Sequence, residues 1–316
     1  MRVLIVGAGS VGQVYGWHLE RGGADVHVFV REKYADEARA GFVLYPPGRQ
    51  VPVRWTPRGV VTSADAVRAQ TWDQVWLCIP SPALRGPWLD ELVAAMGSAT
   101  LVSMLPGLRD RELLDSLVPP ERLVLGLISF SSWHAPLTDE ALPEPGMAWW
   151  HPPLTPNLYE GPKAPVDAIV ATLRKGGCPA ARGAATATAA RGSSFLVNVV
   201  AAMECAGWTF AGLRSGPWAD LAAGAASEAL TISSAHLGVG RGPIGLLMSP
   251  FVVRLATRLA PWIAPMDFEA FLRVHFSKVG AQTSMAIDTW IDDGRKRGLP
   301  VGKLESLAKA LQTARA

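Results

Sequence analysis

The sequence predicts an α/β domain built on a parallel sheet, followed by a second domain made only of helices. In the first half, short apolar runs alternate with helical patterns, which is typical of βαβ units. From about Ser193 onward, long segments rich in alanine and leucine favour helix. The 316 residues also exceed what one hydrophobic core usually holds, so two domains are expected.

The expected elements follow in the order of a parallel sheet with crossover helices. Between Phe130 and Pro165 the chain is rich in proline and tryptophan, which predicts extended segments and loops. The small-residue tract 183–192 marks a junction, so we assign residues 1–186 to the first domain and 187–316 to the second. We expect strands at 3–6, 26–30, 74–79 and 100–104 and helices at 11–21, 84–96, 193–213, 217–237, 246–260, 267–294 and 301–314.

Composition excludes several classes of protein. The 30 basic and 27 acidic side chains are interspersed, without the basic stripe that nucleic acid binding needs. The most apolar later stretch, 244–264, is interrupted by two prolines and two arginines, so no membrane span is expected. The N-terminal apolar run has no cleavage signature and is interpreted as a strand.

Three scattered cysteines, Cys78, Cys178 and Cys205, have neither CxxC spacing nor a histidine-rich neighbourhood in the sequence. We therefore expect no disulfide framework and no metal site. A reducing, cytoplasmic location fits this pattern.

The strongest motif is the GxGxxG formed by Gly7, Gly9 and Gly12, with Ser10 and Val11 inside it. It directly follows an apolar strand and opens an amphipathic helix, which is the context of a Rossmann dinucleotide site. Gly7 would permit the tight turn, Gly9 would let the backbone approach the pyrophosphate, and Gly12 would allow close packing of helix on strand. The helix N-terminus supplies N–H groups for the phosphates.

The second strand is followed by Arg31, where an NAD enzyme usually carries Asp or Glu for the ribose 2′-hydroxyl. An arginine there suits a 2′-phosphate, and Lys33 adds charge, so NADP is the expected cofactor. The alternative is that Arg31 is only a solvated residue at a strand end.

The ends of later parallel strands should also face the cofactor. This places the turn 79–82, with Pro80, and the stretch 103–107, with Leu105, near the nicotinamide. Either segment is equally well explained as a tight turn.

Over essentially its whole length the chain resembles the ketopantoate reductase family of NADP-dependent dehydrogenases. The resemblance is carried by GAGSVGQVYGWHLERGGADVHVFVR at the start, SSFLVNVVAAM in the helical half and AIDTWIDDGRKRGLPVGKLESL near the end. It implies a Rossmann domain followed by a C-terminal helical domain of the 6-phosphogluconate dehydrogenase type.

The chain departs from the family at positions that carry the chemistry. The family's lysine, the general acid to the carbonyl oxygen, falls on Ser194, and its glutamate falls on Gln282. Its asparagine is retained as Asn198. Ser194 and Asn198 lie one turn apart and would face a ligand. Ketopantoate itself is consequently not the expected substrate.

A replacement proton donor is sought on the late helix. His275, Lys278 and Gln282 follow the i, i+3, i+7 spacing that places them on one face of a continuous helix. Either His275 or Lys278 would then protonate the carbonyl, since a general acid typically contributes about 10²–10⁴-fold. The alternative is that Lys278 points to solvent and His275 is a satisfied helix residue.

The leading interpretation is an NADPH-dependent reductase of a carbonyl or imine group on a small or apolar substrate. Two alternatives remain open: a non-catalytic NADP-binding sensor or partner-binding protein, and an opine-type dehydrogenase. A small-molecule substrate is expected as partner, and apolar helices such as 246–260 suggest a homodimer.

Overall fold

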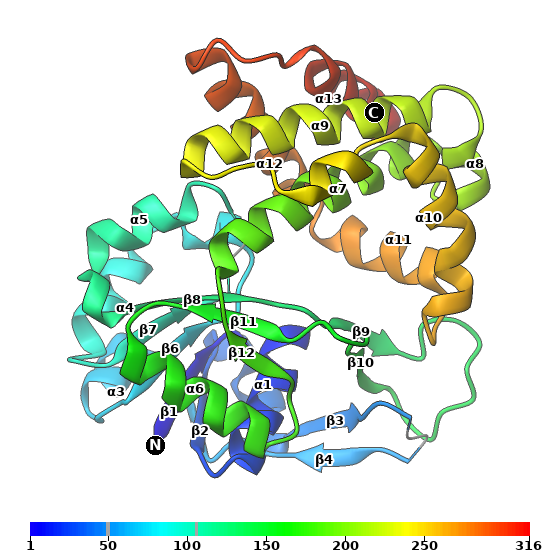
Figure 1. Ribbon diagram of the computed structural model, residues 1–316. Helices are drawn as coiled ribbons and strands as arrows, with labels where there is room; N and C mark the ends of the chain where they lie inside the picture. The colour runs from blue at the N-terminus through cyan, green and yellow to red at the C-terminus, as the bar shows by residue number, and fades with distance from the viewer. Residues whose placement is uncertain (49–50, 105–106) are drawn as a thin grey trace. The chain divides into compact units, whose positions relative to one another are not determined.

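The computed structural model describes residues 1–48, 51–104 and 107–316 (Figure 1). The chain divides into two compact units, of which the first extends to Thr186 and the second begins at Ala187. A short stretch that ends at Arg109 is grouped with the second unit. We call the two parts the α/β unit and the helical unit.

The α/β unit is built on an eight-stranded sheet with the strand order β12-β11-β8-β7-β6-β1-β2-β5. Neighbouring strands are parallel except β8 and β11, which pair antiparallel. This arrangement confirms the predicted α/β fold class. The strands are β1 (Arg2–Val6), β2 (Asp25–Phe29), β5 (Gly59–Val61), β6 (Gln74–Leu77), β7 (Thr100–Ser103), β8 (Leu123–Leu127), β11 (Asn157–Glu160) and β12 (Ala180–Arg182).

Helices cover both faces of this sheet, so β1 is apolar on both sides, as buried parallel strands are. Val3 and Ile5 belong to one buried cluster, and Leu4 and Val6 belong to another. The helices are α1 (Ser10–Arg21), α2 (Ala35–Ala40), α3 (Ala64–Arg68), α4 (Trp88–Ala95), α5 (Asp110–Leu117) and α6 (Lys163–Lys175).

A second, four-stranded sheet with the order β4-β3-β10-β9 belongs to the same unit. Its strands β9 and β10 pack against α1. Trp149 in β10 is 2% exposed and lies edge-on to Trp17 and His18, so it is a core residue. The strands are β3 (Phe42–Tyr45), β4 (Val53–Trp55), β9 (Ser131–Ala135) and β10 (Gly146–Trp150).

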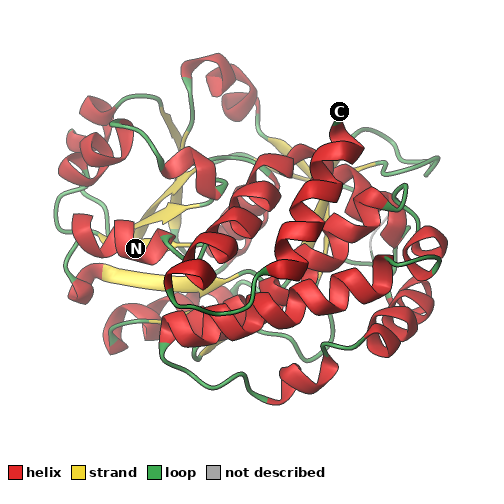
Figure 2. Cartoon of the chain, turned by 90° about the horizontal axis from the view of Figure 1, so that it is seen from above, coloured by secondary structure: helices red, strands yellow, loops and turns green. Residues whose placement is uncertain are grey.

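The helical unit contains no strand in its described residues, which confirms the all-α prediction (Figure 2). Its centre is α9, an alanine-rich helix that packs against α10, α12 and α13. The small side chains of Ala222, Ala226 and Ala229 are fully buried, which lets these helices approach closely. The helices are α7 (Ala185–Cys205), α8 (Phe210–Arg214), α9 (Trp218–Leu237), α10 (Pro250–Ile263), α11 (Phe268–Lys278), α12 (Gly280–Lys296) and α13 (Gly302–Arg315).

Two helix boundaries differ from the prediction in ways that matter for the site. The first helix of the second half begins at Ala185, eight residues before the expected start at 193. The predicted helix 267–294 is wrong as a single element, because it is interrupted at Val279, whose ψ of 23° lies outside the helical range. Gly280 follows directly. Because a glycine inside a helix costs about 1 kcal/mol of helix stability, ending the helix next to it loses little free energy.

None of the described helices has the length and apolar character that crossing a membrane requires.

Candidate active site

The glycine-rich loop joins β1 to α1 at the carboxyl edge of the sheet, where ligands of this architecture bind. Gly7 has a φ of +94°, which favours glycine, and its N–H donates to the carbonyl oxygen of Phe29 at 3.0 Å. A Cβ on Gly12 would stand 2.0 Å from the carbonyl oxygen of Gly7. A Cβ on Gly9 would meet nothing within 4 Å. The loop therefore packs tightly at its two ends and is open in the middle.

This open position lies at the start of a helix. Gly9 is the N-cap of α1, and no side chain caps the helix there. Ser10 and Val11 form the first turn and are partly exposed. Because the first N–H groups of a helix have no intrahelical acceptors and carry partial positive charge, this end can receive a pyrophosphate. The loop is braced by Gln13, whose Nε2 donates to the carbonyl oxygen of Ala8 at 2.9 Å.

A pair of cations follows β2. Arg31 and Lys33 are both exposed and both lie over the ring of Tyr34, at 5.1 and 4.8 Å from its centroid. The Arg31 guanidinium also donates to the Tyr34 hydroxyl at 3.3 Å. Tyr34 therefore holds two positive charges close together beside the end of β2, an arrangement that suits a phosphate monoester.

The turn after β6 contains a buried polar network that the sequence pattern does not reveal. Pro80 is exposed and caps a short 3₁₀ turn that begins with Ser81. The Ser81 hydroxyl donates to the Asp110 carboxylate, and Arg85 donates to the same carboxylate at 2.6 Å. Asp110 is 2% exposed, so Arg85 supplies the charge that a buried carboxylate needs. The predicted cofactor contact Leu105 lies outside the described residues.

In the helical unit, Ser194 and Asn198 lie one turn apart on α7 and are completely buried. The Asn198 amide donates to the carbonyl oxygen of Ser194 at 2.8 Å, while its Oδ1 has no hydrogen-bond partner among the described residues. The Ser194 hydroxyl donates to the carbonyl oxygen of Ala190 at 2.7 Å and lies 3.4 Å from the Ser233 hydroxyl, which accepts from Trp290. Ser194 is thus satisfied internally, and Asn198 retains a free acceptor.

The three residues proposed for the late helix do not share one helix. His275 and Lys278 belong to α11, whereas Gln282 belongs to α12, so the i, i+7 relation that would align Gln282 with His275 is broken at Val279. Lys278 is exposed and His275 is partly buried. Burial, together with the charge of Lys278, lowers the pKa of His275, so its imidazole is neutral at neutral pH.

The structure also contains a cluster of possible metal ligands that was not predicted from the sequence. His18, His151 and Cys178 come together in the α/β unit. They are 133 and 27 residues apart in the chain, and no local spacing links them, so only the tertiary structure brings them together.

Comparison with known proteins gives a family match for part of the chain. Residues 3–136 match the model of the family described as ketopantoate reductase PanE/ApbA. No curated protein shows significant sequence similarity to the chain.

Solved structures match over nearly the whole length. A ketopantoate reductase of the PanE/ApbA family from Ralstonia eutropha JMP134 is 18% identical with a TM-score of 0.73, covering 99% of this chain and 98% of its own. A 2-dehydropantoate 2-reductase from Geobacter metallireducens GS-15 is 18% identical with a TM-score of 0.71, at 99% and 100% coverage. D-mandelate dehydrogenase, solved with NADH and anilino(oxo)acetate, is 12% identical with a TM-score of 0.74, at 99% and 98% coverage.

The family match and the shared fold support an oxidoreductase, as the glycine-rich motif predicts. Residues 3–136 match the ketopantoate reductase family and the full chain has the fold of those enzymes, which confirms the resemblance inferred from its sequence.

Proposed function

We propose that the chain is an NADPH-dependent reductase of a carbonyl or imine group, built on the ketopantoate reductase scaffold and acting on a substrate other than ketopantoate. The observation that carries this proposal is the loop at α1, which is tightly packed at Gly7 and Gly12 and open at Gly9. NADPH supplies the hydride, and the residues of the chain bind the cofactor and orient the substrate.

The preference for NADPH over NADH is supported by the two cations at Tyr34. Arg31 occupies the position after β2 where an acidic residue would bind a ribose 2′-hydroxyl, and Lys33 doubles the positive charge. Both are exposed and available to a phosphate. We propose that they bind the adenosine 2′-phosphate.

The change of substrate is supported by the residues that replace the family's catalytic pair. The Ser194 hydroxyl donates its proton to the carbonyl oxygen of Ala190, so it is a poor substitute for a lysine as general acid. Gln282 replaces a charged carboxylate with a neutral amide. The unpaired Oδ1 of Asn198 is a buried acceptor that costs free energy until a donor reaches it, so we propose that it accepts a hydrogen bond from the substrate.

The proton donor that we propose is Lys278. A general acid must carry a transferable proton at working pH. The lowered pKa of His275 leaves that imidazole neutral, with an N–H that can orient a substrate. Lys278 is exposed at the end of α11, and its side chain ends in an amine that can serve as a donor. Gln282, on the next helix, is proposed to hydrogen-bond the substrate.

The activity is tested by incubating the protein with NADPH and a panel of 2-oxo acids, ketones, cyclic imines and mixtures of a 2-oxo acid with an amine, following absorbance of the reduced cofactor. Turnover of a carbonyl or cyclic imine supports the reductase, whereas turnover that needs the amine identifies an opine-type dehydrogenase. Binding of NADPH without turnover across the panel would overturn the catalytic proposal and favour a non-catalytic NADP sensor.

The donor assignment is tested in the same assay with Lys278→Ala and His275→Ala. We expect Lys278→Ala to lower kcat by about 10²-fold or more and His275→Ala to act mainly on KM. Unchanged turnover in both variants would remove these two residues from the mechanism.

We further propose a cytoplasmic homodimer. The proposed location is supported by three free cysteines, Cys78, Cys178 and Cys205. Association is supported by α10, on which Phe251, Trp262 and other large apolar side chains are exposed. Light scattering should give twice the chain mass of 33.7 kDa, and Trp262→Glu should shift it towards the monomer. A monomer in the unaltered protein would contradict this proposal.

A further inference from the structure

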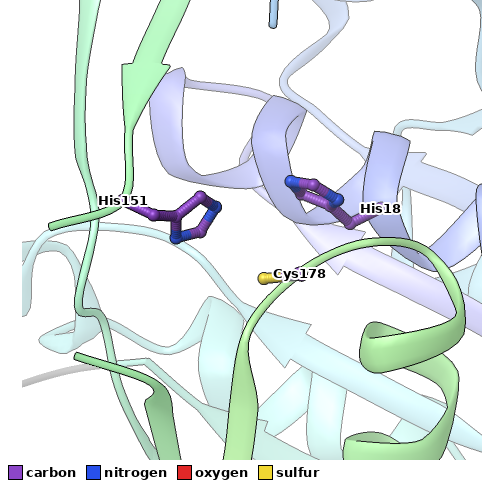
Figure 3. Close-up of side chains that lie close together, drawn as sticks. All are labelled: His18, His151 and Cys178. Carbon is purple, nitrogen blue, oxygen red and sulfur yellow. The ribbon is translucent and has the colours of Figure 1, made fainter. Parts of the chain in front are cut away.

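Three potential metal ligands converge in the α/β unit (Figure 3). His18 lies in the last turn of α1, His151 directly follows β10, and Cys178 lies between α6 and β12. One ligand atom from each residue lies within 4.8 Å of the other two. His18 and Cys178 are 3% and 1% exposed, and His151 is half-buried.

Three of the four ring nitrogens of this cluster are unpaired. His18 Nε2 and both ring nitrogens of His151 are buried and have no hydrogen-bond partner among the described residues. Leaving a buried polar atom unpaired costs about 1–3 kcal/mol, and such atoms are rare in folded proteins. A single cation would take the lone pair of His18 Nε2 and the one lone pair of the neutral His151 ring.

The surroundings of the cluster orient its ligands as a metal site requires. His18 Nδ1 lies 2.9 Å from the carbonyl oxygen of Gly176, which places the proton on Nδ1 and leaves the lone pair on Nε2. The Asn157 amide donates to Cys178 Sγ at 3.5 Å. Asn157 is fixed in turn, because its Oδ1 accepts from the Tyr15 hydroxyl at 2.8 Å. In metal sites, histidine ligands are typically held by a main-chain carbonyl, as His18 is held here by that of Gly176.

The charge states of the two histidines also suit metal binding. Burial lowers the pKa of His18 and of His151 to about 4, so both imidazoles are neutral at neutral pH and can donate a lone pair. The Cys178 thiol would give up its proton to solvent when a cation binds the sulfur. Binding of a divalent cation to the thiol therefore releases one proton and involves no change of oxidation state.

We propose that His18, His151 and Cys178 form a zinc site that ties the end of α1 to the segments after β10 and before β12. Two imidazoles and a thiolate are ligands that zinc prefers, and the cluster has no carboxylate of the kind that calcium or magnesium requires. Zinc with bonds of about 2.0–2.3 Å separates its ligand atoms by about 3–4 Å, so shifts of about 1 Å would close the site. A water completes the tetrahedron.

The site is tested with cobalt as a spectroscopic substitute for zinc. The reduced protein, freed of metal by a chelator, is titrated with Co²⁺ and then with Zn²⁺. We expect one equivalent of Co²⁺ to produce the visible bands of tetrahedral cobalt and a thiolate-to-cobalt charge-transfer band, both abolished by Zn²⁺. Zinc should also raise the melting temperature, because it binds only the folded state.

Matched variants assign the ligands. Cys178→Ser should lose the charge-transfer band and the thermal shift, whereas Cys205→Ser, in the helical unit, should keep both. His151→Ala, at a half-buried position that tolerates truncation, should weaken Co²⁺ binding at least tenfold, whereas His134→Ala, at an exposed position of β9, should not. Absence of a charge-transfer band in the unaltered protein, or equal bands in Cys178→Ser and Cys205→Ser, would overturn the proposal. Neither result depends on dinucleotide binding.

Discussion

At the scale of single residues, the two glycines at the head of α1 have opposite constraints. A methyl group on Gly12 would collide with the carbonyl oxygen of Gly7, whereas a methyl group on Gly9 would enter open space. Gly9 has a φ of −76°, which alanine adopts freely. Gly12 is therefore needed by the fold, whereas the fold makes no such demand on Gly9.

This contrast gives a prediction for two variants. Gly9→Ala should keep the melting temperature and weaken dinucleotide binding at least tenfold, because the methyl group occupies the space that the pyrophosphate needs. Gly12→Ala should lower the melting temperature, because the helix must move away from the strand. Thermal unfolding and isothermal titration measure the two effects. Gly9→Ala with unaltered affinity would show that no pyrophosphate lies at this position.

Arg31 allows an equally specific prediction about cofactor preference. A charge-assisted hydrogen bond to a phosphate is worth about 1.5–3 kcal/mol, so Arg31→Ala should weaken NADPH binding about 10–100-fold and leave NADH binding nearly unchanged. Arg39→Ala is the control, since Arg39 in α2 is also exposed but pairs with Asp36 at 2.8 Å. Equal losses for the two dinucleotides would contradict a 2′-phosphate contact.

At the scale of elements, sequence periodicity predicted four of the eight strands of the larger sheet, β1, β2, β6 and β7, and most of the long helices. The central strand β1 and the helix α1 were placed within a residue of their observed bounds, because a buried apolar strand and a glycine-rich turn have strong local signals. The interruption at Val279 could not be predicted, since Phe271, His275 and Gln282 continue the pattern of one long helix on both sides of it.

One buried carboxylate joins elements of the helical unit and predicts a pH dependence. Asp293 in α12 binds Arg297 at 2.7 Å and lies 3.3 Å from His236 Nδ1 in α9. Burial by itself would raise the pKa of Asp293, but the hydrogen bond from Arg297 and the charges of both partners outweigh it and hold the pKa below 3.8. A lowered pKa stabilises the fold at pH values above about 4, and this stabilisation disappears as the pH falls through the folded-state value.

Asp293→Asn should therefore lower the free energy of unfolding by about 1–2 kcal/mol at pH 7, a modest value because solvent reaches Arg297. The difference between the variant and the unaltered protein should shrink as the pH falls below about 4. Urea unfolding at several pH values measures it. A difference that is constant across this range would mean that Asp293 acts through packing and not through its charge.

At the scale of the whole molecule, fold class and family resemblance follow from the sequence because both depend on local signals repeated along the chain. The cluster of His18, His151 and Cys178 could not be predicted, because its ligands come from three elements that only the folded α/β unit brings together. Asn198 was singled out by the resemblance, but its unpaired oxygen is visible only in the structure.

Dinucleotide binding should stabilise the protein as a whole. At a concentration about 100 times its dissociation constant, NADPH should add about 2.7 kcal/mol to the free energy of unfolding, and NADH at the same concentration should add less. Thermal unfolding with each cofactor provides the comparison. Equal shifts would argue against the NADPH preference while leaving the binding loop in place.

The most direct measurement is isothermal titration of the unaltered protein with NADPH and with NADH under identical conditions. We predict one NADPH bound per chain and weaker binding of NADH. No heat of binding from either dinucleotide at millimolar concentration would contradict the account, because it would leave the open glycine position at α1 and the two cations at Tyr34 without a ligand.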